Sequence, residues 1–215
     1  MKKFLILVIA VVYSTVTVAQ QETTDPKSRG MVGMVSAGGN ISQFTGEGKE
    51  RPAGTKLGYQ IGLTTYSTKM FTIQPGIFLA NKGGKAAGNT VNLNYLQVPV
   101  NMLFNFRVDN EWRVILGAGL YVSLGLWGNW HDGTNQTSIK FFDKEDPYRA
   151  YDFGWQIFGG AQWGRYIATI GIQPGLARIK AIQENGENTN KGRKVHNNSF
   201  TFGLSYILTD PFYNR

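Results

Sequence analysis

The chain has 215 residues, a formal net charge of +8 at pH 7, many Gly (27) and aromatic residues (13 Phe, 10 Tyr, 5 Trp), and no Cys. Without Cys it forms no disulfide, thiolate metal site or thiol nucleophile. An excess of basic residues often indicates nucleic acid as the partner. The N-terminal segment described next predicts secretion, so we expect phosphorylated membrane lipid as the partner and no nucleic acid.

Residues 1–19 have the organisation of a secretory signal peptide. Two lysines precede an unbroken apolar run over residues 4–12, and the segment ends at Ala19, the small residue that signal peptidase requires. A membrane anchor helix is the alternative, but the apolar run is shorter than the roughly 20 residues that span a bilayer. We expect cleavage before Gln20 and a flexible leader over residues 20–30. Because no other segment is as apolar, only a closed barrel could span a membrane.

Residues 31–208 contain eight segments in which apolar and polar residues alternate, the period-two pattern of β-strands with two different faces. The clearest pair forms a hairpin over residues 96–106 and 112–126, around a polar break at 108–111. These two arms reach the roughly nine to eleven residues with which a tilted strand crosses a bilayer. The other segments are 31–44, 57–66, 71–80, 153–163, 166–176 and 199–208.

Short and long connections alternate along the chain. The long, polar ones lie at 46–56, 81–90, 129–151 and 183–197. Outer-membrane barrels show this asymmetry, with short periplasmic turns and long external loops, and an even strand number leaves both termini in the periplasm. We therefore predict an all-β fold, an eight-stranded antiparallel up-and-down transmembrane β-barrel preceded by a cleaved signal peptide. Residues 209–215 would form a C-terminal tail.

A soluble lipocalin-like barrel would also have eight alternating strands, but its apolar face would point inward around a ligand. Here the polar faces carry Gly, Ser, Thr, Asn and Gln and few charges, which favours a tightly filled interior. An eight-stranded barrel is just wide enough to be filled by side chains, so we expect no free diffusion of solutes. The side chains expected inside are Gln74, Phe78, Gln97, Asn101, Asn105, Tyr121, Gln156, Phe158, Gln162 and Gln173.

Three prolines, Pro75, Pro99 and Pro174, fall inside predicted strands, although a closed barrel has no free edge for a residue without an N–H. We expect a local bulge or a missing ladder bond at each. Residues 73–76 and 172–175 both read Ile-Gln-Pro-Gly, four strands apart. This repeat is weak support for a duplicated four-strand half.

Several short motifs occur at spaced positions along the chain. They are Phe71-Thr-Ile-Gln-Pro-Gly followed by Asn81-Lys-Gly, Asn94-Tyr-Leu-Gln-Val-Pro-Val, Tyr151-Asp-Phe-Gly-Trp and Phe200-Thr-Phe-Gly-Leu-Ser-Tyr. The chain resembles the PorT-like outer-membrane β-barrel family in these motifs, over roughly residues 32–208. The resemblance implies an eight-stranded outer-membrane barrel, usually without an assigned activity, whose founding member is linked to protein secretion. Residues 209–215 depart from the usual ending on an aromatic residue, which the insertion machinery recognises.

The sequence has no recognised catalytic spacing. His131 and His196 fall in predicted external loops, and nothing places a nucleophile against either imidazole. Two histidines with scattered carboxylates fall short of a metal site, and we expect no metal and no cofactor. We predict a non-enzymatic outer-membrane protein that is structural or interacts through its external loops, with a role as a secretion accessory implied by the resemblance. The alternatives are a soluble periplasmic lipocalin-like ligand-binding barrel and an outer-membrane hydrolase or acyltransferase.

Two sets of external-loop residues are candidates for binding. A basic rim, which also includes Lys56 and Lys82, could bind the phosphates of lipopolysaccharide through charge-assisted contacts, or serve loop solubility alone. Its candidate contacts are Lys180, Lys191, Arg193 and Lys194. An aromatic set could bind a protein partner, or its rings could pack on one another. That set is Trp130, Phe141, Phe142 and Tyr148. Outer-membrane lipid and the barrel-insertion machinery are the other expected partners.

Overall fold

The computed structural model describes residues 32–46, 54–86, 89–109, 111–131, 135–139, 141, 150–177 and 195–208. The predicted signal peptide, the leader and the C-terminal tail therefore lie outside the described residues. Every regular element in the described ranges is a β-strand. No helix among these residues is long and apolar enough to cross a membrane.

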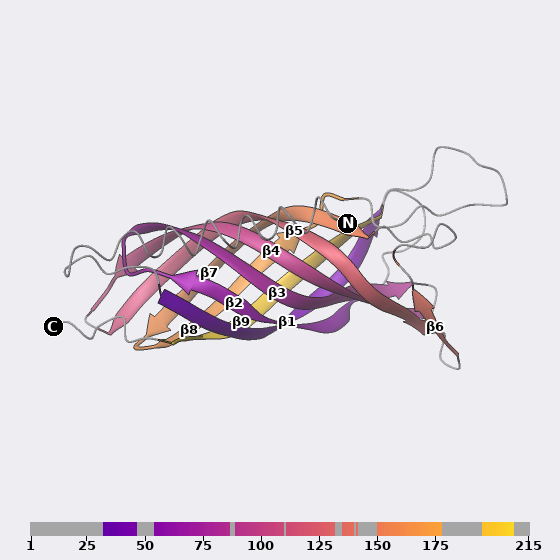
Figure 1. Ribbon diagram of the computed structural model, residues 1–215, viewed down its shortest axis with the longest axis horizontal. Coiled ribbons are helices and arrows are strands. Elements are labelled where there is room, and N and C mark those ends of the chain that lie inside the picture. The colour runs from indigo at the N-terminus through magenta and orange to yellow at the C-terminus, as the bar shows by residue number, and fades with distance from the viewer. Residues whose placement is uncertain are drawn as a thin grey trace.

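Eight of the nine antiparallel strands close into a barrel (Figure 1). Around the wall the order is β1, β2, β3, β4, β5, β7, β8 and β9, and β9 pairs back with β1. The short strand β6 instead pairs with the end of β5. The bounds are β1 (Val32–Gly46), β2 (Lys56–Tyr66), β3 (Phe71–Ala86), β4 (Asn89–Arg107), β5 (Trp112–His131), β6 (Gln136–Ile139), β7 (Tyr151–Trp163), β8 (Tyr166–Pro174) and β9 (Val195–Ile207). The predicted eight-stranded antiparallel barrel is confirmed.

Two predicted loops contain strands. Residues 81–90 were expected as a polar loop, but β3 continues through them to Ala86 and pairs with β4 from Asn81↔Asn94 to Ala86↔Asn89. The prediction of a loop at 81–90 was wrong because both faces of this hairpin end are largely polar, so the apolar alternation that indicates a strand is missing. The second case is β6, which lies inside the predicted loop 129–151 and pairs with residues 128–131 of β5.

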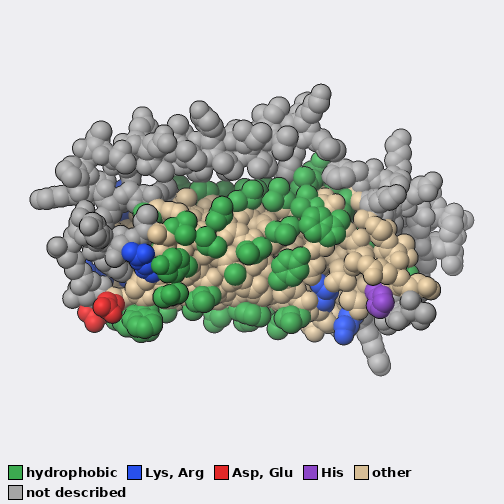
Figure 2. Space-filling model, turned by 60° about the horizontal axis from the view of Figure 1, so that its bottom comes forward, with side chains coloured by type: hydrophobic (Ala, Val, Ile, Leu, Met, Phe, Trp, Pro, Cys, Tyr) green, Lys and Arg blue, Asp and Glu red, His purple; other side chains and the backbone are tan. Residues whose placement is uncertain are grey.

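The barrel wall is apolar outside and polar inside. On the outer face Leu57, Leu120 and Ile170 are 70%, 68% and 61% exposed, whereas inward Gln97 and Gln162 are 2% and 0% exposed. Figure 2 shows hydrophobic side chains spread along the wall and charged side chains toward the two ends. A soluble lipocalin-like barrel would have the opposite arrangement. The outer surface is therefore suited to lipid.

Aromatic side chains mark both edges of the apolar surface. At the end with the short turns, Trp112 stacks on Trp163 with ring centroids 6.2 Å apart, and Tyr166 packs on Tyr206 at 5.3 Å. Toward the other end, Trp127 is 48% exposed. Trp112 and Trp127 are fifteen residues apart on β5, which corresponds to about 36–42 Å along the axis of a barrel with typical strand tilt. This length approximates that of a bilayer with its headgroup regions, about 40–45 Å.

Each of the three strand prolines lies at a gap in one ladder, as predicted. The β2–β3 ladder ends at the pair Thr64↔Gly76, next to Pro75, and the β3–β4 ladder omits Pro99 and the residue before it. The β7–β8 ladder ends at Ile157↔Ile172, omits Gln173 and Pro174, and resumes only as the isolated bridge Gly154↔Gly175. The β3–β4 and β7–β8 ladders have the same register on both sides of their gaps, so a missing ladder bond, and not a bulge, accommodates Pro99 and Pro174. At Pro75, by contrast, the β2–β3 ladder ends.

Replacing Leu120 by Arg tests whether the apolar belt lies in lipid. Leu120 lies midway between Trp112 and Trp127 on β5, and Val108, in the β4–β5 turn, is equally exposed at 68%. We expect Leu120→Arg to lower the free energy of unfolding in lipid vesicles by about 2–4 kcal/mol, since the charge would lie at the bilayer midplane. Val108→Arg should change it by less than about 0.5 kcal/mol. Equal, small effects in denaturant titrations would contradict a membrane-embedded belt.

Candidate functional site

The candidate site lies in the lumen, where strand alternation turns polar side chains inward. All ten residues predicted to point inward are there. Eight of them are buried, and Phe78 and Phe158 line a luminal cavity. The inner face was therefore predicted correctly from the alternation alone.

Apolar side chains close the lumen toward the short turns. Six strands each contribute one of them, and together they form a buried cluster that we call the turn-side seal. Its members are Met34, Tyr66, Leu103, Ile115, Ile167 and Ile207. Tyr66 is 1% exposed and its hydroxyl donates a hydrogen bond to Gln162 Oε1, so the polar atom of this large side chain is satisfied.

A second buried apolar cluster, the loop-side seal, closes the opposite end. Its members are Val91, Leu93, Tyr95, Ile139, Phe141 and Ala150. Val91, Leu93 and Tyr95 are alternate residues of β4 whose side chains point inward. Ile139 belongs to β6, and Phe141 and Ala150 belong to the connection between β6 and β7. Phe141 is 6% exposed, with its ring centroid 5.7 Å from that of Tyr95. A Cβ at Gly125 would come within 2.8 Å of the Phe141 ring, so the glycine makes room for the ring.

The two predicted sets of loop residues are only partly placed by the structure. Phe141 is buried in the loop-side seal and Trp130 packs against that seal, so these two rings belong to one packed cluster. Phe142 and Tyr148 lie outside the described residues. So do all four basic candidates, Lys180, Lys191, Arg193 and Lys194, and both proposed surfaces stay predictions.

The structure does not bring the two histidines onto neighbouring strands. His131 ends β5 and is exposed, whereas His196 is half-buried on β9. Strands β7 and β8 lie between them in the wall. Among the described residues no group of three or more His, Cys, Asp or Glu side chains is arranged to hold a metal ion.

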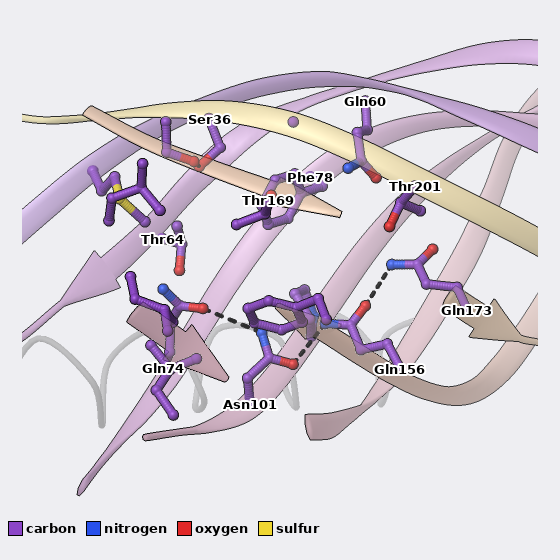
Figure 3. A pocket seen from close by; sticks show the side chains of 18 of the residues that line it. Ser36, Gln60, Thr64, Gln74, Phe78, Asn101, Gln156, Thr169, Gln173 and Thr201 are labelled. Carbon is purple, nitrogen blue, oxygen red and sulfur yellow. Dashed lines mark hydrogen bonds between the residues drawn. The ribbon is translucent and has the colours of Figure 1, made fainter. Parts of the chain in front are cut away.

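Four side-chain amides form a hydrogen-bonded chain across the lumen (Figure 3), which we call the amide chain. Asn101 Nδ2 donates to Gln74 Oε1 at 3.3 Å, and Gln156 Nε2 donates to Asn101 Oδ1 at 2.6 Å. Gln173 Nε2 in turn donates to Gln156 Oε1. The chain thus links β3, β4, β7 and β8. Because each amide offers both a donor and an acceptor, such a chain can cross the lumen without any charge.

Gly119 lets the amide chain pass over β5. It lies directly between Asn101 on β4 and Gln156 on β7 in the register of the sheet. A Cβ at this position would come within 2.4 Å of Asn101 Oδ1 and 2.2 Å of the Val100 carbonyl oxygen. Any larger residue would therefore push the two amides apart.

Buried charges lie between the amide chain and the loop-side seal. Lys82 and Asp152 are each 1% exposed and interact electrostatically. Lys82 Nζ has no hydrogen-bond acceptor among the described residues and lies 4.2 Å from the ring centroid of Tyr121, a cation–π contact. The expectation that Lys82 belongs to an outer basic rim was wrong, because its segment is strand and the side chain points inward. Lys56 is also buried, and its ammonium donates to Asn81 Oδ1.

On the turn side of these charges lies a cavity of about 90 Å³ (Figure 3). Amides of Gln74, Asn101, Gln156 and Gln173 line it on one side, and hydroxyls with the Gln60 amide on the other. The hydroxyl residues are Ser36, Thr64, Thr169, Thr201 and Ser205. Phe78 and Phe158 complete the wall, and the turn-side seal contributes the floor. The sequence could not predict this cavity, because it depends on how side chains from separated strands meet.

A solved structure that is similar in fold supports this architecture. No protein-family model and no curated protein matches the chain. Among solved structures, Neisserial surface protein A is similar with a TM-score of 0.51 and 11% identity, over 83% of this chain and 99% of that one. Two structures of Ail from Yersinia pestis, one in complex with the heparin analogue sucrose octasulfate, have TM-scores of 0.41 and 0.39 at 9% identity. They cover 82% and 81% of this chain and 97% and 96% of theirs.

Neisserial surface protein A is an eight-stranded outer-membrane barrel. The chain has the fold of an outer-membrane β-barrel. At 11% identity the similarity concerns the fold alone. The resemblance to the PorT-like family stays a prediction.

Replacing Gly119 by Val should break the amide chain. The added side chain has no room beside Asn101, so we expect the free energy of unfolding to fall by about 1–3 kcal/mol, the usual effect of overpacking. Gly159→Val on β7 is the matched control, because a Cβ there points outward and meets nothing closer than 3.6 Å. Denaturant titration of the detergent-folded barrel, followed by gel mobility, measures both. Similar stabilities of the two variants would contradict the steric role of Gly119.

A double-mutant cycle tests the buried charge pair. Lys82→Met or Asp152→Asn alone leaves one buried charge without its partner and should cost about 3–5 kcal/mol of stability. The double variant should lose clearly less than the sum of the two single losses, because neither charge remains. Additive losses in the same unfolding assay would show that the two charges do not depend on each other.

Proposed function

We propose that the protein is a non-enzymatic, non-conducting outer-membrane protein that works through its external part as a structural or interaction protein. The observation that carries the proposal is the closure of the lumen by buried apolar seals at both ends. A sealed, side-chain-filled lumen offers solutes no continuous aqueous path. We therefore assign the structural or interaction function to the surface that the barrel presents outside the membrane.

The proposed orientation places the short turns and both termini in the periplasm. The first and last barrel strands pair from Met34↔Ile207, so the described ends of the chain lie together at the end with the short turns. Barrels of this class have short turns on the periplasmic side and longer connections outside. The loop-side seal then faces the cell exterior.

The external part includes an extended ribbon, which we define as residues 81–86, 89–94, 127–131 and β6. It continues β3, β4 and β5 past the aromatic edge at Trp127, and Figure 1 shows β6 at its tip. A ribbon held by strand pairing presents its side chains on a rigid support, which suits recognition of a partner. A role as an accessory to protein secretion is supported by the family resemblance, and contact with lipopolysaccharide by the predicted basic set.

Planar-bilayer recording tests the absence of conduction. The purified, refolded barrel should give no stepwise current, because both seals exclude water and ions from the lumen. A sixteen-stranded porin in the same chamber serves as the positive control, since its lumen is an open aqueous channel. Regular current steps from the wild-type protein would overturn the proposal.

Shortening the ribbon tests the external role. We would replace residues 85–90 and residues 131–136 each by a two-residue turn, which leaves the lipid-facing wall, both seals and the buried pair of Lys82 and Asp152 in place. In cells whose growth or protein secretion depends on the full-length chain, this variant should reach the outer membrane, shift on heating in gels as folded barrels do, and fail to restore the phenotype. Full restoration by the shortened barrel would contradict a role for the ribbon.

A further inference from the structure

A bulge in β5 decides which side chains of the external ribbon face away from the barrel axis. The β4–β5 register shifts between Asn94 and Tyr95, which leaves Leu126 as an extra residue in β5. On the turn side of the bulge the odd-numbered residues of β5 are the buried ones. Beyond it the phase is reversed, because Trp130 packs on the loop-side seal and Trp127 is 48% exposed. The bulge therefore turns the odd-numbered residues of this part of β5 outward.

The outward side of the ribbon is a continuous polar sheet surface, which we call the outer ribbon face. Strand pairing places three side chains from β4, β5 and β6 in one row, and three from β3, β5 and β6 in the next. Side chains directly opposite each other on paired strands are about 5 Å apart. All six are exposed or half-buried. The first row is Asn92, Asn129 and Ser138, and the second is Lys85, His131 and Gln136.

The chemistry of the outer ribbon face matches a phosphorylated sugar. The amides of Asn92, Asn129 and Gln136 each offer a donor and an acceptor, which suits sugar hydroxyls. Lys85 adds a positive charge, and Gly54 packs against its stem, since a Cβ at Gly54 would lie 3.3 Å from Lys85 Cβ. None of the six side chains is acidic. Figure 2 likewise shows basic and histidine side chains, and no acidic one, among the described residues at this end of the drawn face.

An aromatic side chain held on a rigid base lies beside this face. Asn94 Nδ2 donates to the Trp127 carbonyl oxygen at 3.4 Å, while Asn94 Oδ1 accepts from Asn81 Nδ2 at 2.9 Å and from the Tyr59 hydroxyl at 3.2 Å. Four strands thus fix the backbone at Trp127, and its exposed indole offers an apolar surface for the C–H face of a sugar ring. His131 is four residues away, about 13 Å along the strand, which leaves room for an oligosaccharide.

The position of the outer ribbon face indicates where that sugar comes from. The face continues the lipid-facing wall past the aromatic edge, so in the proposed orientation it lies beside the sugars that cover the outer leaflet. We propose that it binds the phosphorylated core oligosaccharide of lipopolysaccharide in the same membrane. The amides bind sugar hydroxyls, Lys85 binds a core phosphate and Trp127 packs on a ring. This inference rests on the proposed external position of the ribbon and names its partner.

Calorimetric titration with deacylated core oligosaccharide tests the proposal on the full mature barrel in detergent micelles. The wild type should bind saturably, and less tightly at high salt because one contact is ionic. Lys85→Ala and Trp127→Ala should each weaken binding about tenfold, the loss expected for one charge-assisted hydrogen bond or one ring contact.

The same two changes near the short turns are the matched controls. Lys69 is exposed and Trp163 is 56% exposed, so neither replacement should disturb the barrel more than its counterpart. Lys69→Ala and Trp163→Ala should bind the oligosaccharide as the wild type does. Heat-dependent gel mobility confirms that each variant is folded, so lost binding is not mistaken for unfolding.

A dephosphorylated core identifies the group that Lys85 holds. It should bind the wild type about tenfold more weakly, and Lys85→Ala should cause no further loss. Additive losses would contradict the contact between Lys85 and phosphate. The proposal is overturned if the wild type does not bind the core, or if Lys85→Ala and Trp127→Ala bind it as the controls do. If the shortened ribbon still fails in cells, the external function stands with a different partner, whereas its full restoration would remove that function itself.

Discussion

The need to satisfy every backbone hydrogen bond within lipid governs this structure. No water reaches the hydrocarbon region, so the strands must pair on both sides and the sheet must close. Closure with eight strands leaves a lumen only as wide as the side chains that fill it. Large inward residues therefore require small neighbours. Gly119 beside Asn101 and Gly117 beside Phe158 are places where a Cβ would collide with the neighbouring side chain.

The filled interior is sorted along the barrel axis. The turn-side seal comes first, then the amide-lined cavity, then the buried charges, then the loop-side seal. This order allows polar groups inside without a water channel, because apolar layers close both ends. It also keeps Lys82 and Asp152 close to each other and away from the neutral cavity, which limits the free-energy cost of burying charge. The barrel therefore combines an apolar exterior with a polar, non-conducting core.

The sequence predicted the parts of the fold that lipid imposes. Apolar and polar residues alternate where one face of a strand meets lipid and the other faces the lumen. The strands and their inward-pointing residues could therefore be predicted from this alternation. The extension of β3 and β4 past Ala80 and the strand β6 were missed because this alternation weakens outside the bilayer. Contacts such as Gln156 with Gln173 were not predicted because barrel closure, and not sequence spacing, decides which inward side chains meet. Lys82 was wrongly assigned to an external loop because the apolar alternation that indicates a strand weakens in its segment.

The repeated Ile-Gln-Pro-Gly segment shows how the wall tolerates a missing N–H. The β2–β3 ladder ends at Thr64↔Gly76, so Thr65 lies opposite Pro75, which cannot donate to it. The Thr65 carbonyl oxygen instead accepts a hydrogen bond from Gln74 Nε2 at 2.9 Å. In the second copy Gln173, next to Pro174, donates into the lumen to Gln156. The glutamine before each proline thus supplies a side-chain donor where the ladder is interrupted, and the two glutamines end the amide chain. The same tetrapeptide therefore both breaks the wall's ladder and anchors the polar interior.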